Sequence, residues 1–258
     1  MTSTVFETDT PDPIAYLDRV AATDPGRSYK QRMLAELDVP DGGTVLDLGC
    51  GPGADLGALA AAAGPAGRVI GIDLDRAAVD AATARTAGLP TVEVRLGDLQ
   101  ELPLPDGAAD RARTDRVLQH VADPAGALGG IHRVLRPGGR LVTGEPDWGT
   151  LTVDHPDGDL SQAYTRYVTE QAVRNAHIGG RLPRLAAEAG FTVTAVLPIT
   201  PVFRDVRTAD LILGLERCTR RAVTAGYFTE DGAARWLDHL ENGPFFAAFT
   251  LYVVVADR

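Results

Sequence analysis

The sequence contains little lysine and little cysteine, and it has no long hydrophobic run. Lys30 is the single lysine among 258 residues, so no Gly-Lys-Ser/Thr triplet exists and a P-loop is excluded. Two cysteines, Cys50 and Cys218, are too few for a disulfide framework. No stretch approaches the length of a membrane span, and the first residues lack the pattern of a signal peptide. We therefore expect a cytoplasmic protein without a membrane partner.

Positive charge is also scarce. The chain has 25 Lys and Arg against 35 Asp and Glu, and its formal net charge is -10. An acidic surface disfavours binding to phosphate backbones, so we expect no nucleic-acid partner. Nearly all the cations are arginine, next to abundant alanine, glycine and aspartate, which is typical of a coding bias. Single arginines therefore receive little functional weight at this point.

A glycine-rich turn between a predicted strand and a predicted helix is the main motif of the chain. Residues 45–56 read VLDLGCGPGADL, in which Gly49, Gly51 and Gly53 alternate with other residues. Glycine has no Cβ, so the backbone can turn sharply and approach a ligand closely. The ligand then lies against the N–H groups that open the next helix. This turn predicts a binding site for a nucleotide-like cofactor.

Two classes of cofactor compete for the turn. Gly49, Gly51 and Ala54 also fit the dinucleotide fingerprint in its G-x-G-x-x-A form. Pro52 argues against a dinucleotide because it has no N–H to offer a pyrophosphate. Asp47 places a carboxylate near the ligand, which repels pyrophosphate but suits an ammonium or sulfonium group. The run D-x-G-x-G-x-G from Asp47 to Gly53 resembles the first motif of class I S-adenosyl-L-methionine (SAM) methyltransferases, so we favour SAM over NAD(P). An oxidoreductase and a SAM-binding protein without methyl transfer remain the alternatives.

An acid follows each of the first three predicted strands. Asp47 ends the first strand, Asp73 ends the strand over residues 68–73, and Asp98 follows the strand over residues 91–96. The alternation of strands and helices with short turns predicts an α/β fold with a doubly wound parallel sheet. The carboxyl ends of its strands share one rim, where ligands bind. Asp73 can accept hydrogen bonds from the two hydroxyls of a ribose. Asp98 can accept a hydrogen bond from an adenine amino group, with the Leu99 side chain packed on the adenine ring.

Three further segments, LPLPDGAAD, VLQHVADP and VLRPGGRLV, complete a family resemblance. Together with the glycine turn they resemble the class I SAM-dependent methyltransferases, in particular the small-molecule group that includes the ubiquinone/menaquinone type. The similarity covers roughly residues 42–145. It implies a Rossmann-like seven-stranded sheet whose last strand is antiparallel. Residues 191–197 and 246–255 are the candidates for the final two strands.

The resemblance also implies which residues hold the cofactor. By this resemblance, Asp47, Gly49 and Gly51 hold the methionine end of SAM. The main-chain carbonyl of Thr114 falls where it would meet the SAM amino group. The full set expected to contact SAM, or the product S-adenosyl-L-homocysteine, is Tyr29, Asp47, Gly49, Gly51, Gly53, Asp73, Leu74, Asp98, Leu99 and Thr114. The fourth strand is followed by Thr-Asp-Arg and not by Asn/Asp-Pro-Pro-Tyr/Phe, which argues against a nucleobase acceptor.

Aromatic residues are absent between Lys30 and Asp147 and gather on both sides of this segment. We expect an N-terminal helical cap at residues 1–41, made of two short helices divided at residues 24–26. A SAM-binding core follows at residues 42–146. Residues 147–258 then supply a loop, a helix over 160–175, two helices within 208–241, and the closing strands. The flanks would form an aromatic helical lid that shapes a small-molecule pocket and excludes water.

The acceptor side of the site is less defined. His177, at the end of the predicted insertion helix, is the preferred general base, and a helix cap is its alternative role. Glu145 is a second catalytic candidate, as a carboxylate on the rim. The residues expected to bind the substrate are Tyr16, Asp115, Arg116, His120, Asp147 and Trp148. No spaced ligand cluster predicts a metal. We expect a monomer or homodimer that methylates O or N of a small, partly apolar metabolite.

Overall fold

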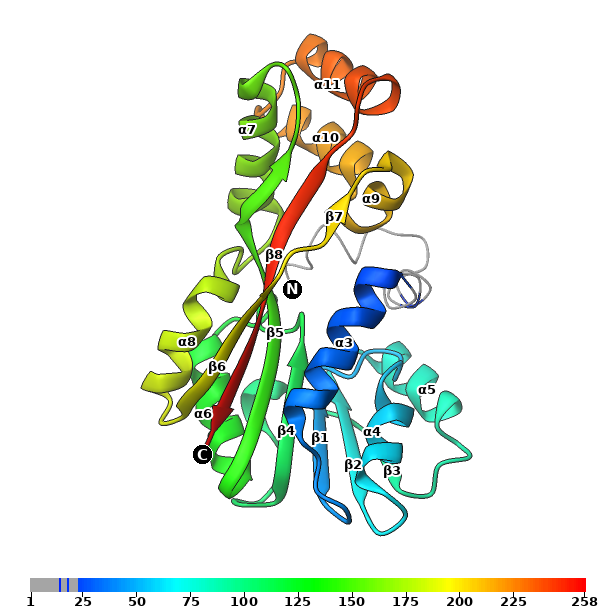
Figure 1. Cartoon of the computed structure of the whole chain (residues 1–258), viewed down its shortest axis with the longest axis vertical. Helices are drawn as coiled ribbons and strands as arrows, with labels where there is room; N and C mark the ends of the chain where they lie inside the picture. Colours follow the sequence, from blue (N-terminus) through cyan, green and yellow to red (C-terminus); the bar gives the residue numbers. More distant parts are fainter. Residues whose placement is uncertain (1–13, 15–17, 19–22) are drawn as a thin grey trace.

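A computed structural model describes residue 14, residue 18 and residues 23–258 of the chain, and it shows an α/β fold (Figure 1). The strands are β1 Thr44–Leu48, β2 Arg68–Asp73, β3 Val92–Leu96, β4 Ala109–Asp115, β5 Leu135–Val153, β6 Thr192–Ile199, β7 Val202–Phe203 and β8 Ala247–Asp257. The helices are α3 Asp24–Leu37, α4 Leu56–Ala63, α5 Arg76–Arg85, α6 Pro124–Val134, α7 Gly158–Tyr167, α8 Ile178–Glu188, α9 Val206–Leu213, α10 Leu215–Thr224 and α11 Glu230–Asn242. Two short segments complete the set, the 3₁₀ helix η1 Leu99–Glu101 and the π-helix η2 Val168–Ala172.

The eight strands in the described part of the chain belong to one doubly wound sheet. Its order is β3-β2-β1-β4-β5-β8-β6, and β7 also pairs with β8. Strands β1 to β5 run parallel, whereas β8 is antiparallel to both β5 and β6. The predicted Rossmann-like sheet with an antiparallel last strand is confirmed, and the two-residue β7 is the strand beyond the expected seven. The strand order reverses at β1, the place where such sheets bind ligands.

Alternate residues of the central strands enter two different hydrophobic layers. Val45 and Val69 pack with α3, α4 and α5, and Leu46 and Ile70 pack with α6 and α8 on the other face. Since side chains of a strand alternate between faces, a strand covered on both sides needs apolar residues at every position. β1 meets this rule except at Asp47, which is buried on the α3 face. That exception marks the site described below.

β5 is longer than the sequence indicates, because it runs for 19 residues. The chain from residue 147 was predicted to leave the sheet as a loop. It continues the strand instead, since Thr152 and Val153 pair with Ala248 and Ala247 of β8. Figure 1 shows β5 and β8 as a long ribbon whose far end carries α7, α10 and α11. The predicted boundary between core and lid at residue 146 therefore falls inside a strand common to both.

The helices outside the core differ from the prediction in three places. The helix predicted over 160–175 divides into α7 and η2 and ends at Ala172. Gly214, in the left-handed conformation with φ 59°, separates α9 from α10, so three helices occupy residues 206–242. The segment 24–26 does not divide two helices, because it forms the first turn of α3, which Thr23 caps by accepting from the Gly26 amide at 3.1 Å.

The four helices α7, α9, α10 and α11, which we call the lid, share an aromatic core. Tyr164 of α7 and Trp236 of α11 are fully buried and stack at 5.5 Å between ring centroids. Phe228 packs against the same indole at 5.9 Å. The Tyr164 hydroxyl donates to the Leu213 carbonyl at 2.8 Å, which connects α7 with the end of α9. The lid is thus held by packed rings and by a buried hydrogen bond.

Tyr164→Phe should lower the free energy of unfolding by about 1–2 kcal/mol, because it leaves the Leu213 carbonyl buried without this donor. Tyr227→Phe is a matched control, since its hydroxyl donates to Glu170 at 2.7 Å in an exposed position. We expect this control to lose less than about 0.5 kcal/mol. Urea denaturation of both variants measures the difference, and equal losses would contradict a lid held by the buried bond.

Candidate active site

The main-chain amides of the glycine turn after β1 donate hydrogen bonds to other groups of the protein. The bonds are Gly49 N to Ile72 O (2.7 Å), Cys50 N to Ile72 O (3.1 Å), Gly51 N to Asp73 Oδ2 (2.7 Å) and Gly53 N to Cys50 O (3.0 Å). Pro52, the remaining residue of the turn, has no N–H. From residue 49 to residue 53 the turn therefore has no amide left to bind a pyrophosphate.

Two of the glycines are required by close packing. Gly49 has φ 74°, and a Cβ on it would lie 2.3 Å from the Val117 side chain in the segment after β4. Gly53 has φ 78°, and a Cβ on it would lie 2.9 Å from Ala82 Cβ on α5. The third glycine of the motif thus has a structural reason, since it lets the turn approach α5. The turn is fixed between the end of β4 and α5.

The ends of β2 and β3 carry the predicted nucleoside contacts. Asp73 Oδ1 accepts from the Asp75 amide at 2.9 Å, so both carboxylate oxygens of Asp73 are positioned by main-chain donors. Burial raises the pKa of Asp73, and these amide hydrogen bonds act in the opposite direction. Leu74 beside it is 63% exposed. Asp98 accepts from the Gln100 amide at 2.9 Å and caps η1, whereas the Leu99 side chain packs into the core.

A cluster of ionised side chains, which we call the buried charge network, lies behind the glycine turn. It consists of three carboxylates and two cations: Asp47 of β1, Asp55 before α4, Asp115 at the end of β4, Lys30 of α3 and Arg113 of β4. The Arg113 guanidinium lies 3.6 Å from Asp47, 3.1 Å from Asp55 and 3.0 Å from Asp115. Lys30 Nζ binds Asp55 and lies 2.6 Å from Asp115.

The network sets the protonation of its carboxylates. Burial raises the pKa of Asp47 to about 6, and Arg113 opposes that shift. Burial would also raise the pKa of Asp115, but Lys30 and Arg113 outweigh it and hold that pKa below its usual range. The Tyr29 hydroxyl donates to Asp115 at 3.2 Å, and Arg116 Nε lies 3.7 Å from the same carboxylate.

The structure thus brings together four residues predicted from the sequence, Tyr29, Asp47, Asp115 and Arg116. Sequence reasoning missed Lys30, Asp55 and Arg113. Arg113 could have been noticed, because the central strands of a doubly wound sheet are covered on both faces, and a charge on such a strand has to be paired. It was discounted because arginine is common in this chain.

Glu145 holds the turn after β4. Its carboxylate is fully buried and accepts from the amides of Val117 (2.8 Å), Leu118 (2.7 Å) and Gln119 (3.2 Å). Burial raises the pKa of Glu145 to about 7, and these three amides oppose the shift. The sequence suggested Glu145 as a catalytic candidate, a carboxylate on the rim. In the structure both of its oxygens accept from main-chain amides, so Glu145 positions the turn after β4.

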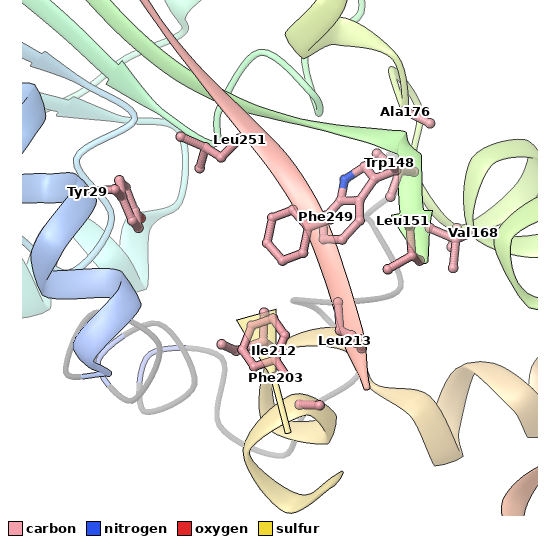
Figure 2. Packing of buried hydrophobic residues seen from close by; sticks show 14 of the residues in the cluster. Tyr29, Trp148, Leu151, Val168, Ala176, Phe203, Ile212, Leu213, Phe249 and Leu251 are labelled. Carbon is pink, nitrogen blue, oxygen red and sulfur yellow. The ribbon is translucent and has the colours of Figure 1, made fainter. Parts of the chain in front are cut away.

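The same turn orients Trp148. The Gln119 side chain donates to the Arg116 carbonyl at 3.1 Å and accepts from Trp148 Nε1 at 2.9 Å. The Trp148 ring lies 4.9 Å from that of Phe249 on β8 (Figure 2). His120, at the end of the turn, is partly buried, and the Thr114 hydroxyl pairs with that of Thr143 at 2.7 Å inside the sheet.

His177 is separated from these residues. It directly precedes α8, so it stands at the start of the following helix and not at the end of α7. Its Nδ1 lies 3.2 Å from Asp147, which also accepts from the amides of Gly149 and Gly180. A pocket of about 440 Å³ is lined by Gly149, Leu151, Thr152, Ser161, Gln162, Thr165, Arg166, Thr169 and His177. That lining includes no residue of the glycine turn. Tyr16 lies outside the described residues.

A smaller pocket of about 240 Å³ lies between α3 and α4 and reaches the buried charge network. Its lining residues are Arg27, Lys30, Gln31, Leu34, Ala54, Asp55, Ala58, Leu59 and Arg113. Within the described part of the chain, no three His, Cys, Asp or Glu side chains gather as metal ligands. Within the same part, no helix has the length and apolar character to cross a bilayer.

A glycine turn at the reversal point of a doubly wound sheet, with acids in β1, at the end of β2 and beyond β3, is typical of Rossmann-like folds that bind a nucleoside cofactor. A family model described as a methyltransferase domain matches residues 40–190, more than half of the chain. The chain therefore belongs to this family and is a class I SAM-dependent methyltransferase.

The chain is also similar to curated proteins and to solved structures. A protein of transposon TN4556 from Streptomyces fradiae is 62% identical over 98% of this chain and 73% of its own length. Demethylmenaquinone methyltransferase of Staphylococcus aureus is 33% identical in a matched region that covers 53% of this chain and 57% of that enzyme. The structure of geranyl diphosphate C-methyltransferase from Streptomyces coelicolor, determined with S-adenosyl-L-homocysteine, has a TM-score of 0.57 at 18% identity and covers 90% of this chain and 76% of its own. That likeness shows the fold.

Glu145→Gln should flatten the pH dependence of stability. The pKa of Glu145 in the folded state, about 7, lies above the ordinary 4.5. The unfolded chain therefore loses this proton first, and the contribution of Glu145 to the free energy of unfolding falls as the pH rises between these values, by about 3 kcal/mol. Glutamine cannot titrate, so the variant lacks this decline.

Urea unfolding at pH 5, 6 and 7 measures the slope for each protein. Glu188→Gln is the control, since Glu188 is exposed and pairs with Arg184 on the same helix. It should keep the wild-type slope. An unchanged slope in Glu145→Gln would show that Glu145 is already ionised below pH 5.

Proposed function

We propose that the chain binds SAM across the carboxyl ends of β1 to β4 and transfers its methyl group to O or N of a small, partly apolar acceptor. The observation that carries this proposal is the use of amides in the glycine turn. Dinucleotide enzymes bind pyrophosphate with free N–H groups at this position. Here those groups donate to Ile72, Asp73 and Cys50. The turn can fit closely around a ligand but does not provide an anion site, which suits a cationic cofactor and not NAD(P).

The residues at the rim fit an adenosyl group. Asp73 is held by two amides and is only partly buried, so it can still accept hydrogen bonds from a ribose. Among the residues that the structure describes, Leu74 is the most exposed large apolar side chain at 63%, and an adenine ring would cover it. Asp98 at the end of β3 supplies an acceptor for the adenine amino group. Asp47 and Asp115 supply negative charge near the turn for the ammonium group.

SAM supplies an activated methyl group, and the protein has to align the acceptor and exclude water. Trp148, Phe249, Phe203 and Leu251 form an apolar layer between the strand ends and the lid (Figure 2). No charged side chain belongs to this layer. We infer that the acceptor has an apolar part that contacts these residues, with Gln119 holding the Trp148 indole in place.

His177 remains a candidate base only for an acceptor that reaches α8. Asp147 and Trp148 are consecutive on β5, so their side chains point to opposite faces. Asp147 contacts His177 and the Gly180 amide on the α8 face, whereas Trp148 packs in the layer that includes Tyr29 of α3. An acceptor resting on Trp148 is therefore separated from His177 by the strand. A neutral amine, which needs no strong base to attack SAM, fits this arrangement better than a hydroxyl.

Asp73→Ala should weaken the binding of S-adenosyl-L-homocysteine by about 1–3 kcal/mol, because the ribose loses its acceptor. Asp75→Ala is the matched control. Its carboxylate caps α5 through the Ala77 amide at 2.8 Å, so the affinity should change by less than about 0.5 kcal/mol. Titration calorimetry of both variants, and of wild type with NADH, measures the affinities.

Tighter binding of NADH than of S-adenosyl-L-homocysteine by the wild type would overturn the proposal. Turnover separates methyl transfer from cofactor binding alone. Methyl-labelled SAM, incubated with small amines, alcohols and carbon acids that carry apolar groups, should label one class of acceptor. Labelling of a carbon acid alone would correct the proposed acceptor atom.

A further inference from the structure

Arg113 occupies an unusual place for a charged residue. It lies on β4 between Ala112 and Thr114, both of which are fully buried, and its own side chain is 4% exposed. A buried guanidinium without partners would cost many kcal/mol, so its surroundings have to balance it. Its partners come from three separate elements: Asp47 from β1, Asp55 from the segment before α4, and Asp115 from the end of β4.

The charges around Asp47 balance one another. The groups that face it or its partners are the carboxylates of Asp55 and Asp115, the cations of Lys30, Arg113 and Arg116, the Tyr29 hydroxyl and the Cys50 thiol. Together with Arg116, which lies 3.7 Å from Asp115 beside the network, three cations face its three carboxylates. Without Arg113, one negative charge would be in excess in a space shielded from water. Asp47, which is fully enclosed and lies near Asp55, would then take up a proton at a higher pH.

The position of the network relates it to the cofactor. Asp47 immediately precedes the residues Leu48 and Gly49 that lead into the glycine turn, and Asp115 ends β4 next to the segment that packs on Gly49. The pocket between α3 and α4 is lined by Lys30, Asp55 and Arg113 together with Ala54, the residue after the turn. The network therefore borders the turn at the side where the carboxylates of β1 and β4 meet.

We propose that Arg113 is a positioning residue for the cofactor, which holds Asp47, Asp55 and Asp115 in place beside the glycine turn so that Asp47 and Asp115 present their negative charge to the ammonium group of the methionine portion. This inference rests on the proposed function. Arg113 acts through the carboxylates and need not touch the cofactor. Its loss should therefore change the pH at which the amino-acid portion of the ligand is recognised, and not the recognition of the nucleoside.

The test is the pH profile of ligand binding between pH 5.5 and 8.5. Titration calorimetry with S-adenosyl-L-homocysteine should show wild-type affinity falling as the pH drops through about 6, where Asp47 takes up its proton. Arg113→Gln should move that midpoint upward by about 1–3 pH units, since an adjacent arginine lowers a carboxyl pKa by that amount. Arg113→Lys retains the charge and should stay near the wild-type midpoint.

A second ligand separates positioning from general damage. 5′-Methylthioadenosine has the adenine and ribose but lacks the amino-acid portion, so its affinity should not follow the same pH profile in any variant. Equal effects on both ligands would overturn the inference, because they would mean that Arg113→Gln merely disturbs the fold. An unchanged midpoint for S-adenosyl-L-homocysteine in Arg113→Gln would overturn it as well.

A milder variant covers the case in which Arg113→Gln does not fold. Asp55→Asn removes one of the negative charges that raise the pKa of Asp47, so the midpoint should move downward, opposite to the effect of losing Arg113. A midpoint that rises or stays fixed in Asp55→Asn would count against the network. Failure of the wild type to bind S-adenosyl-L-homocysteine at any pH would reject the proposed function itself, which is a different outcome from all of these.

Discussion

Two buried carboxylates and the partly exposed Asp55 surround one guanidinium, and their ion pairs connect α3, β1, β4 and the start of α4. Removing ions from water costs several kcal/mol for each, and the mutual attraction repays this only when the geometry is good and every group is paired. Arg113 meets that condition in part: it reaches Asp47, Asp55 and Asp115 at once, and Lys30 closes the cluster from α3, but Arg113 Nε lies 3.6 Å from Asp47 and makes no hydrogen bond to another described residue. An alternative packing of α3 would leave at least one of these charges unpaired. The main effect of the network is therefore to favour one packing of α3 against the sheet, and its contribution to the free energy of unfolding is secondary.

The lid is connected to this rigid centre through a shared strand pair. β5 begins beside β4 in the parallel sheet and continues, paired with β8, to the helices at the far end of the molecule (Figure 1). Glu145 and Trp148 lie along that route. Glu145 fixes the turn after β4 through three amides, and the same turn presents Gln119 to the Trp148 indole. The position of the apolar layer relative to the glycine turn is consequently fixed by β5 and not by the lid helices.

The sequence allowed the glycine turn, the acids at the strand ends and the reversal of strand order to be predicted, because each depends on local periodicity and turn chemistry. The continuation of β5 could not be predicted in this way. Thr152 and Val153 belong to a strand only because β8 supplies Ala248 and Ala247, almost a hundred residues away. The task of Glu145 depends equally on a distant partner, the 117–119 turn. Arg113 carried a local signal, a charge in a buried strand, but the abundance of arginine concealed it.

The same glycine pattern can serve two cofactors, and the destination of its amides distinguishes them. In this chain the Gly51 amide donates to Asp73, the residue proposed to accept the ribose, so the turn and the end of β2 are fixed to one another. That bond leaves the Gly51 amide unable to donate to a ligand. A pyrophosphate loses by this change and also meets the carboxylates of Asp47 and Asp73, which suit a positively charged ligand instead. The ribose is common to both cofactors, so Asp73 alone does not separate them. The proposed selectivity therefore rests on hydrogen bonds made within the protein, which the motif alone does not reveal.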